Sequence, residues 1–169
     1  MHRRAAGPAP GHAAGSKGNM DLLLWRHADA WDARPGQDDL DRALTPTGEQ
    51  QAARIGRWLA GVVPASARVL ASPARRTQQT AAALGRSFET VPSIAPGASP
   101  QEVLAAAGWP QAAQTVVVVG HQPTMGLAAS LLMSGSAQHW AVAKAAVWWL
   151  RREHDGRARL IAVRGPEQG

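Results

Sequence analysis

Three short polar clusters each follow a run of apolar residues directly, at Arg26-His27, Ser72–Arg76 and Gly120-His121. Ligands of open α/β sheets bind at the carboxyl ends of the strands, so we expect two imidazoles and at least two guanidinium groups to meet in one crevice. Planar guanidinium forks suit phosphate oxygens. Helices expected to begin after Pro73 and Pro123 would add backbone N–H groups at their N-termini. The expected ligand is a phosphate-like anion.

Two imidazoles among arginines indicate nucleophilic catalysis. A neutral ring nitrogen of His27 or His121 can attack phosphorus and hold the phosphoryl group covalently. Neighbouring arginine charges help because they disfavour protonation of the imidazole, which would block the attack. The second histidine and the arginines would stabilise charge on the phosphoryl oxygens. The pattern alone does not decide which of the adjacent residues Arg75 and Arg76 points its side chain inward, so both remain candidates for the pocket.

Other chemistries fit the chain less well. A single histidine at a strand end is more often a hydrogen-bonded structural residue, and only the paired placement of His27 and His121 favours catalysis. The sequence contains no HxxxH motif for a metal and no GxxxxGK[ST] loop, so we expect neither a metal site nor a P-loop kinase. The absence of cysteine excludes thiolate zinc sites and cysteine-nucleophile phosphatases. His139 and His154 follow no strand end and are expected at the surface.

The elements that would position these residues alternate along the chain. Short apolar runs predict buried strands, and apolar residues at intervals of three and four predict helices. The expected strands are 22–25, 68–71, 89–91, 115–119, 145–150 and 158–163. The expected helices run from Thr45-Pro46 to about Gly61, from after Pro73 to about Arg86, from about Gln101 to Ala107 and from about Thr124 to Met133. This order predicts a three-layer α/β/α sandwich with a mostly parallel central sheet and an antiparallel pair near its end. The polar segment 28–43 with its five aspartates reads as a loop with a solvated acidic surface.

Length and composition agree with one domain. The chain has 169 residues, of which 45% are hydrophobic, and a net charge of +6. Three basic residues and no acid lie in residues 1–19, so the rest of the chain carries +3. We expect a flexible tail at 1–19 and a folded domain at 20–169. No basic stripe with interleaved aromatics and no span of about 18 apolar residues occurs, which argues against nucleic-acid and membrane partners. Together with the absence of cysteine and of a secretory signal, this favours a cytoplasmic protein.

Four segments of the sequence resemble motifs of the histidine phosphatase superfamily, also called phosphoglycerate-mutase-like. Their order and spacing resemble its SixA-like phosphohistidine phosphatase branch. The matching segments are Leu24-Trp25-Arg26-His27-Ala28, Arg42-Ala43-Leu44-Thr45, Ser72-Pro73-Ala74-Arg75-Arg76-Thr77-Gln78-Gln79-Thr80 and Val119-Gly120-His121-Gln122-Pro123. The resemblance implies that His27 is the phosphorylated nucleophile, with Arg26, Arg76 and His121 completing the phosphate pocket. In the family's S-P-x-x-R pattern the fifth residue is the pocket arginine, which here is Arg76.

The chain also departs from the larger members of that family. Ala28 replaces a glycine after the nucleophile, and the acid that donates a proton has only weak candidates in Glu102 and Asp29. When phosphohistidine is cleaved, its imidazole leaves as a neutral group, which needs less help from an acid than a leaving alkoxide does. The resemblance therefore implies a metal-independent phosphohistidine phosphatase without a cofactor, acting on a phosphorylated protein. A promiscuous small-molecule phosphomonoesterase or a catalytically weak phosphoprotein-binding module remain alternatives, and Lys144 is a possible rim residue.

Overall fold

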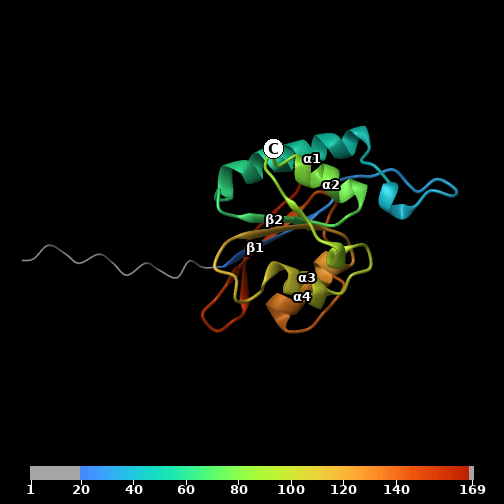
Figure 1. Cartoon of the computed structure of the whole chain (residues 1–169). Helices are drawn as coiled ribbons and strands as arrows, with labels where there is room; N and C mark the ends of the chain where they lie inside the picture. The colour runs from blue at the N-terminus through green and yellow to red at the C-terminus, as the bar shows by residue number, and fades with distance from the viewer. Residues whose placement is uncertain (1–19, 168–169) are drawn as a thin grey trace, which may run out of the picture.

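The computed structural model describes residues 20–167 as a sheet between two layers of helices (Figure 1). The helices α1 (Pro46–Val62) and α2 (Arg75–Ala82) cover one face of the sheet. The helices α3 (Pro100–Ala107) and α4 (Thr124–Ser134) cover the other face. The three-layer α/β/α sandwich predicted from the alternation of strands and helices is confirmed.

The sheet has six strands in the order β3-β2-β4-β1-β5-β6. Their bounds are β1 Asp21–Arg26, β2 Arg68–Ala71, β3 Glu89–Thr90, β4 Val116–Gly120, β5 Val147–Arg152 and β6 Ala158–Arg164. β4 pairs in parallel with β1 and β2, and β2 pairs in parallel with β3. β5 runs antiparallel to both of its neighbours, β1 and β6. The sheet is therefore mostly parallel, with the expected antiparallel pair at one end.

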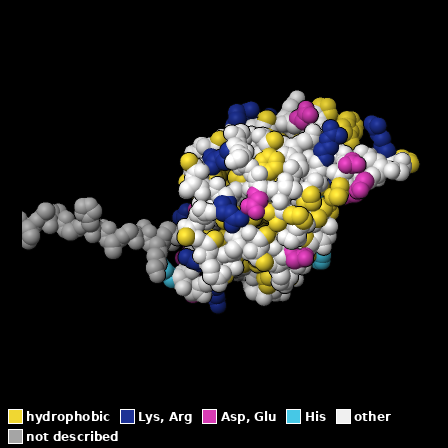
Figure 2. Space-filling model, in the orientation of Figure 1, with side chains coloured by type: hydrophobic (Ala, Val, Ile, Leu, Met, Phe, Trp, Pro, Cys, Tyr) yellow, Lys and Arg dark blue, Asp and Glu magenta, His cyan; other side chains and the backbone are white. Residues whose placement is uncertain are grey.

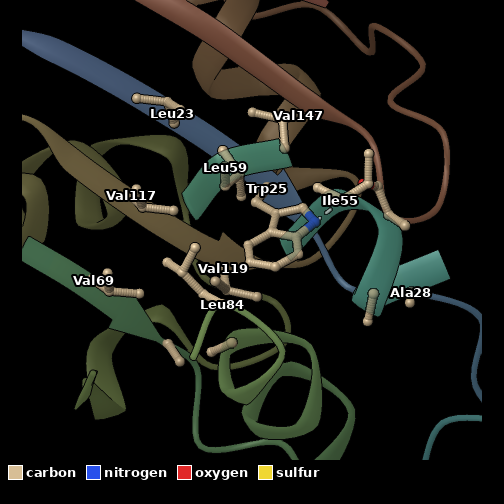
Figure 3. Packing of buried hydrophobic residues seen from close by; sticks show 14 of the residues in the cluster. Leu23, Trp25, Ala28, Ile55, Leu59, Val69, Leu84, Val117, Val119 and Val147 are labelled. Carbon is tan, nitrogen blue, oxygen red and sulfur yellow. Dashed lines mark hydrogen bonds between the residues drawn. The ribbon is translucent and has the colours of Figure 1, made fainter. Parts of the chain in front are cut away.

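Two buried clusters, one on each face, explain why the central strands read as continuous apolar runs. Successive side chains of a strand point to opposite faces, so Leu23 and Trp25 pack under α1 and α2, while Leu22 and Leu24 pack against α3 and α4. The four valines of β4 divide between the clusters in the same way. Figure 3 shows Trp25 at the centre of the first cluster. Its Nε1 donates to the carbonyl of Ala145 at 3.1 Å, which ties the segment before β5 to β1.

The start of α1 is fixed by local sequence and by a close contact. The Thr45 Oγ1 accepts a hydrogen bond from the backbone N–H of Gly48 at 3.0 Å, and Pro46 occupies the first turn. A Cβ on Gly48 would lie 1.9 Å from the carbonyl oxygen of Asp29. Only glycine allows this approach, so the helix end packs directly on the segment that follows β1.

The structure corrects the expected end of α2, the expected start of β5 and the interpretation of the segment 28–43 as a loop. α2 ends at Ala82 instead of near Arg86, because the chain turns at Gly85, whose φ is 75°. β5 begins at Val147, because Ala145 adopts a φ of 61° that an extended strand does not allow. The segment expected as a plain loop contains a short 3-10 helix, η1 (Asp39–Asp41).

Two further observations concern the charged side chains at the surface and the composition of the helices. Figure 2 shows basic and acidic side chains interspersed on the face it draws. Within residues 20–167, no helix combines the length and apolar character needed to cross a membrane. The expected tail at 1–19 lies outside the described residues.

Candidate active site

A cavity of about 310 Å³ opens at the carboxyl ends of β1 and β4. Four cations and two imidazoles line it: Arg26, Arg42, Arg76, Lys144, His27 and His121. The other lining residues are Ala30, Asp32, Pro96 and Gln122. The structure thus brings together all four residues that the sequence predicted for the phosphate pocket, from three distant segments of the chain.

Neighbouring parallel strands place the two histidines side by side. Arg26 ends β1 and pairs with Gly120, the last residue of β4, so His27 and His121 leave the sheet at the same level. The backbone N–H of His27 donates to the carbonyl of Gly120 at 3.0 Å and extends this pairing by one residue. The centroids of the two imidazole rings lie 5.3 Å apart.

The hydrogen bond of His27 fixes its tautomer. Its Nδ1 lies 2.7 Å from the carbonyl oxygen of Ala28, which can only accept, so the ring proton sits on Nδ1 and Nε2 keeps a free lone pair. Burial lowers the pKa of His27 to about 4. The hydrogen bond to the Ala28 carbonyl opposes this effect, and the smaller effects of the Arg76 and Arg26 charges add to it. His27 is therefore a neutral imidazole with an available ring nitrogen at neutral pH.

Ser72 determines the tautomer of His121. The His121 Nε2 lies 2.7 Å from the Ser72 Oγ, which also accepts a hydrogen bond from the backbone N–H of Ala74 at 3.3 Å. Among the described residues, His121 Nε2 is the one acceptor within reach of the Ser72 hydroxyl proton, so we assign that proton to the bond with Nε2, which places the ring proton of His121 on Nδ1. Burial and the charges of Arg76 and His27 lower the pKa of His121 to about 3. Its Nδ1 is buried without a hydrogen-bond partner among the residues described, so it is a donor left for a ligand.

The two adjacent arginines of α2 have opposite environments. The side chain of Arg76 is 3% exposed and lines the cavity, whereas Arg75 is exposed. One helical step of about 100° separates them, so both cannot face the sheet. The structure places Arg76 inward, as the resemblance implies.

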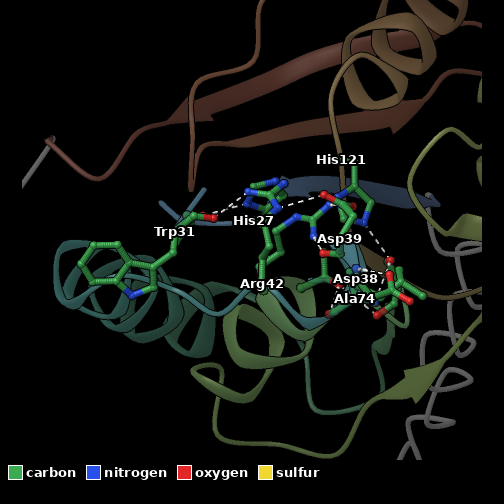
Figure 4. A network of polar contacts seen from close by, with 12 residues as sticks. His27, Trp31, Asp38, Asp39, Arg42, Ala74 and His121 are labelled. Carbon is green, nitrogen blue, oxygen red and sulfur yellow. Dashed lines mark hydrogen bonds and ion pairs between the residues drawn. The ribbon is translucent and has the colours of Figure 1, made fainter. Parts of the chain in front are cut away.

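The site also involves Arg42 and Asp39, from the segment between β1 and α1, and the sequence did not predict either of them as a site residue. Arg42 lines the cavity, and its Nη1 donates to the carbonyl of Trp31 while its Nε donates to the Asp39 carboxylate, each at 2.9 Å (Figure 4). Asp39 also accepts hydrogen bonds from Arg76. Asp39 is exposed, as the interpretation of these aspartates as a solvated surface expects, but that interpretation did not include its contacts with the two arginines. The place of Arg42 at the head of the Arg-Ala-Leu-Thr motif was a usable signal, but nothing in the local sequence distinguishes Asp39 from its neighbours.

Neither carboxylate considered as a proton donor lines the cavity. Glu102 closes a capping box at the start of α3, where its Oε2 accepts from the backbone N–H of Ser99 at 2.8 Å. The Asp29 Oδ1 accepts from Lys144 Nζ at 2.6 Å, and hydrogen bonds from Lys144 and Thr45 lower the pKa of Asp29. The acidic side chain that does line the cavity is Asp32.

The composition of the cavity suits an anion. Within the part of the chain described, no group of three or more histidine, aspartate or glutamate side chains could hold a metal ion. Guanidinium and ammonium groups surround two neutral imidazoles instead, an arrangement that binds a phosphoryl group through charge and directed N–H donors.

Comparison with known proteins agrees with this geometry. The sequence matches the histidine phosphatase superfamily (branch 1) over residues 22–98. A solved structure described as a candidate phosphohistidine phosphatase SixA, from Nakamurella multipartitia, is 34% identical, and the match has a TM-score of 0.74 and covers 89% of this chain and 98% of that one. A second SixA candidate, from Agrobacterium tumefaciens, is 27% identical with a TM-score of 0.74, and the match covers 86% of this chain and 97% of the other.

Sequence relatives extend the similarity. The uncharacterized protein Rv1276c of Mycobacterium tuberculosis is 38% identical over 114 residues, which are 64% of this chain and 70% of that protein. An uncharacterized protein of Picosynechococcus sp. is 31% identical over 151 residues, which are 85% of this chain and 90% of that protein. The sheet, the helices and their order match the phosphoglycerate-mutase-like fold of the solved structures. This chain is therefore a phosphatase that belongs to the histidine phosphatase superfamily and to its SixA-like branch.

Proposed function

We propose that this protein hydrolyses phosphohistidine carried by another protein, through a covalent phosphoryl group on His27. The observation that carries the proposal is the state of that imidazole. It is neutral, its Nδ1 proton is held by the Ala28 carbonyl, and its Nε2 lone pair is free in a cavity lined by four cations. Residues 20–169 would form the catalytic domain.

Two displacements at phosphorus complete the reaction. In the first, the His27 Nε2 attacks phosphorus, the P–N bond to the substrate imidazole breaks, and its electron pair stays on the leaving ring. In the second, the oxygen of a water molecule attacks phosphorus, the P–Nε2 bond breaks, and inorganic phosphate leaves. Arg26, Arg76 and the Nδ1–H of His121 would stabilise the charge on the three transferring oxygens in both steps.

The acid–base groups of the cavity favour phosphohistidine as the substrate. A phosphate ester releases an alkoxide that needs a strong proton donor, whereas a protonated imidazole ring leaves as a neutral group. Asp32 is the one carboxylate among the lining residues, whereas Glu102 and Asp29 do not line the cavity, and the pKa of Asp29 is lowered. Transfer between two imidazoles is also nearly symmetric in energy, so hydrolysis of the phosphoenzyme supplies the driving force. The similarity to SixA candidates supports the same substrate.

Covalent labelling tests the proposal. The protein is incubated with a phosphoramidate, and acid-labile phosphate bound to it is measured for the wild type, for His27→Ala and for the matched control His139→Ala, which changes an exposed histidine. We expect labelling of the wild type and the control and none of His27→Ala. Labelling that persists in His27→Ala would overturn the assignment of the nucleophile.

A substrate panel separates the alternatives. Rates of phosphate release are compared for a phosphohistidine protein, a phosphoserine peptide and sugar phosphates. The proposal requires the largest kcat/KM for the phosphohistidine protein. A larger value for sugar phosphates would identify a small-molecule phosphatase, and labelling without release would identify a binding module with little turnover.

A further inference from the structure

Asp39 accepts hydrogen bonds from both terminal nitrogens of Arg76. The Arg76 Nη1 donates to the backbone carbonyl of Asp39 at 2.7 Å, and its Nη2 donates to the Asp39 Oδ2 at 2.9 Å. The other carboxylate oxygen accepts from the Arg42 Nε at 2.9 Å. One carboxylate therefore bridges two cations that line the cavity, in the way that two phosphate oxygens would.

The bridge joins the half-exposed carboxylate of Asp39 to a buried guanidinium group. The Arg76 side chain is 3% exposed, so without Asp39 its charge would lack a partner in a desolvated place. Burial alone would raise the pKa of Asp39, but hydrogen bonds from Arg76 and Arg42 outweigh it and hold the pKa below its usual value. Asp39 is therefore an anion at neutral pH, which makes it a substitute for phosphate and a poor proton donor.

The segment that carries Asp39 is held by hydrogen bonds and not by buried side chains. None of the residues 31–41 is buried, and η1 contains no buried side chain. The side-chain oxygen of Asp38 accepts from the backbone N–H of Leu40 and keeps η1 itself in shape. Figure 1 shows the segment between β1 and α1 extending away from the layers of the sandwich. Its movement would expose little apolar surface, so displacement of Asp39 is mainly an exchange of hydrogen-bond partners at the arginines.

We propose that Asp39 is a specificity-determining residue that competes with small phosphate ligands for Arg76 and Arg42. The inference rests on the proposed function, because it places the phosphoryl group at the same arginines. Asp39 engages one N–H of each terminal nitrogen of Arg76, through its carbonyl at Nη1 and its carboxylate at Nη2, so a ligand that uses these two N–H groups must displace Asp39. Inorganic phosphate offers only its own oxygens in exchange, so its affinity is reduced and the product leaves readily.

Equilibrium binding of inorganic phosphate tests the inference without requiring turnover. Isothermal titration calorimetry compares the wild type with Asp39→Asn and with Asp41→Asn, which removes the same charge from the same 3-10 helix at an exposed position without a contact to Arg76. We expect Asp39→Asn to bind phosphate about tenfold more tightly, since charge-assisted hydrogen bonds to the competitor are lost. Asp41→Asn should stay within about twofold of the wild type on the basis of screened surface charge. Asp39→Ala should act in the same direction as Asp39→Asn.

The outcomes distinguish this inference from the proposed function. Equal affinities of Asp39→Asn and Asp41→Asn, or weaker binding by Asp39→Asn, would overturn the competition while leaving the phosphate site in place. Arg76→Ala serves as the reference for that site. If it binds phosphate as tightly as the wild type, the phosphate does not bind at Arg76, and both the inference and the proposed function are wrong.

Discussion

Arg76 and Arg75 offer a test in which two neighbouring arginines should behave in opposite ways. The Arg76 side chain is 3% exposed and lines the cavity, and both of its terminal nitrogens donate to Asp39. Loss of one preorganised donor from an active site costs about 2–4 kcal/mol of transition-state stabilisation. At about 1.4 kcal/mol for each factor of ten, Arg76→Ala should lower kcat/KM by roughly 30- to 1000-fold. Arg75 is exposed, so Arg75→Ala should change kcat/KM by less than about twofold.

The assay measures phosphate release from a phosphohistidine protein under steady-state conditions, with urea denaturation of each variant to separate activity from stability. Arg76→Lys refines the result, because lysine keeps the charge but not the planar fork. We expect it to recover only part of the lost kcat/KM. Equal losses for Arg76→Ala and Arg75→Ala would mean that the inward face of α2 has been misassigned, and the reasoning from burial to catalysis would fail.

Three further perturbations test the fold and its titrating groups. Gly48→Ala should lower the free energy of unfolding by about 1–3 kcal/mol, because the added Cβ would meet a backbone carbonyl. Gly61→Ala, also in α1 but with open space around it, should raise the free energy of unfolding by about 0.5–1 kcal/mol. Similar urea midpoints for the two variants would contradict the packing argument. The folded-state pKa values of His27 and His121, about 4 and about 3, lie below the ordinary 6.5, so the unfolded chain binds protons first as the pH falls. The free energy of unfolding should therefore be at its full value above pH 6.5 and fall between pH 6.5 and about 4, by up to about 1.4 kcal/mol per pH unit for each histidine. A free energy of unfolding from urea denaturation that stays constant over that pH range would refute the burial of the two histidines as neutral imidazoles. Removal of residues 1–19 should leave the melting temperature and the rate of phosphate release unchanged, and a loss of either would show that the domain extends into this segment.

The parts of the fold that could be predicted are those in which burial repeats along the chain. β1 and β4 are covered on both faces, so every residue of their apolar runs is buried and the sequence shows an uninterrupted hydrophobic stretch. Polar residues that directly follow such strands must lie at their carboxyl ends, which is why His27 and His121 could be placed together without coordinates. The end of α2 could not be predicted in this way, because its alanines favour helix formation as far as Arg86 and only the turn at Gly85 stops it.

The role of Asp39 depends on a contact between residues that are 37 positions apart, and its local sequence has the polarity of any exposed loop. Four of the residues lining the cavity are cations, and only Asp32 among them is acidic, so an acid from elsewhere is electrostatically favoured near Arg76 when no phosphate is bound. Charge balance therefore favours aspartates of the segment 28–43 near the site, where Asp32 lines the cavity and Asp29 pairs with Lys144 in addition to the contact of Asp39 with Arg76. It does not select among the five, because each has the same charge and η1 alone decides which one reaches Arg76. The same requirement explains why the contact would be exchangeable: phosphate satisfies Arg76 and Arg42 in place of Asp39, and little apolar burial between residues 31 and 41 opposes the replacement.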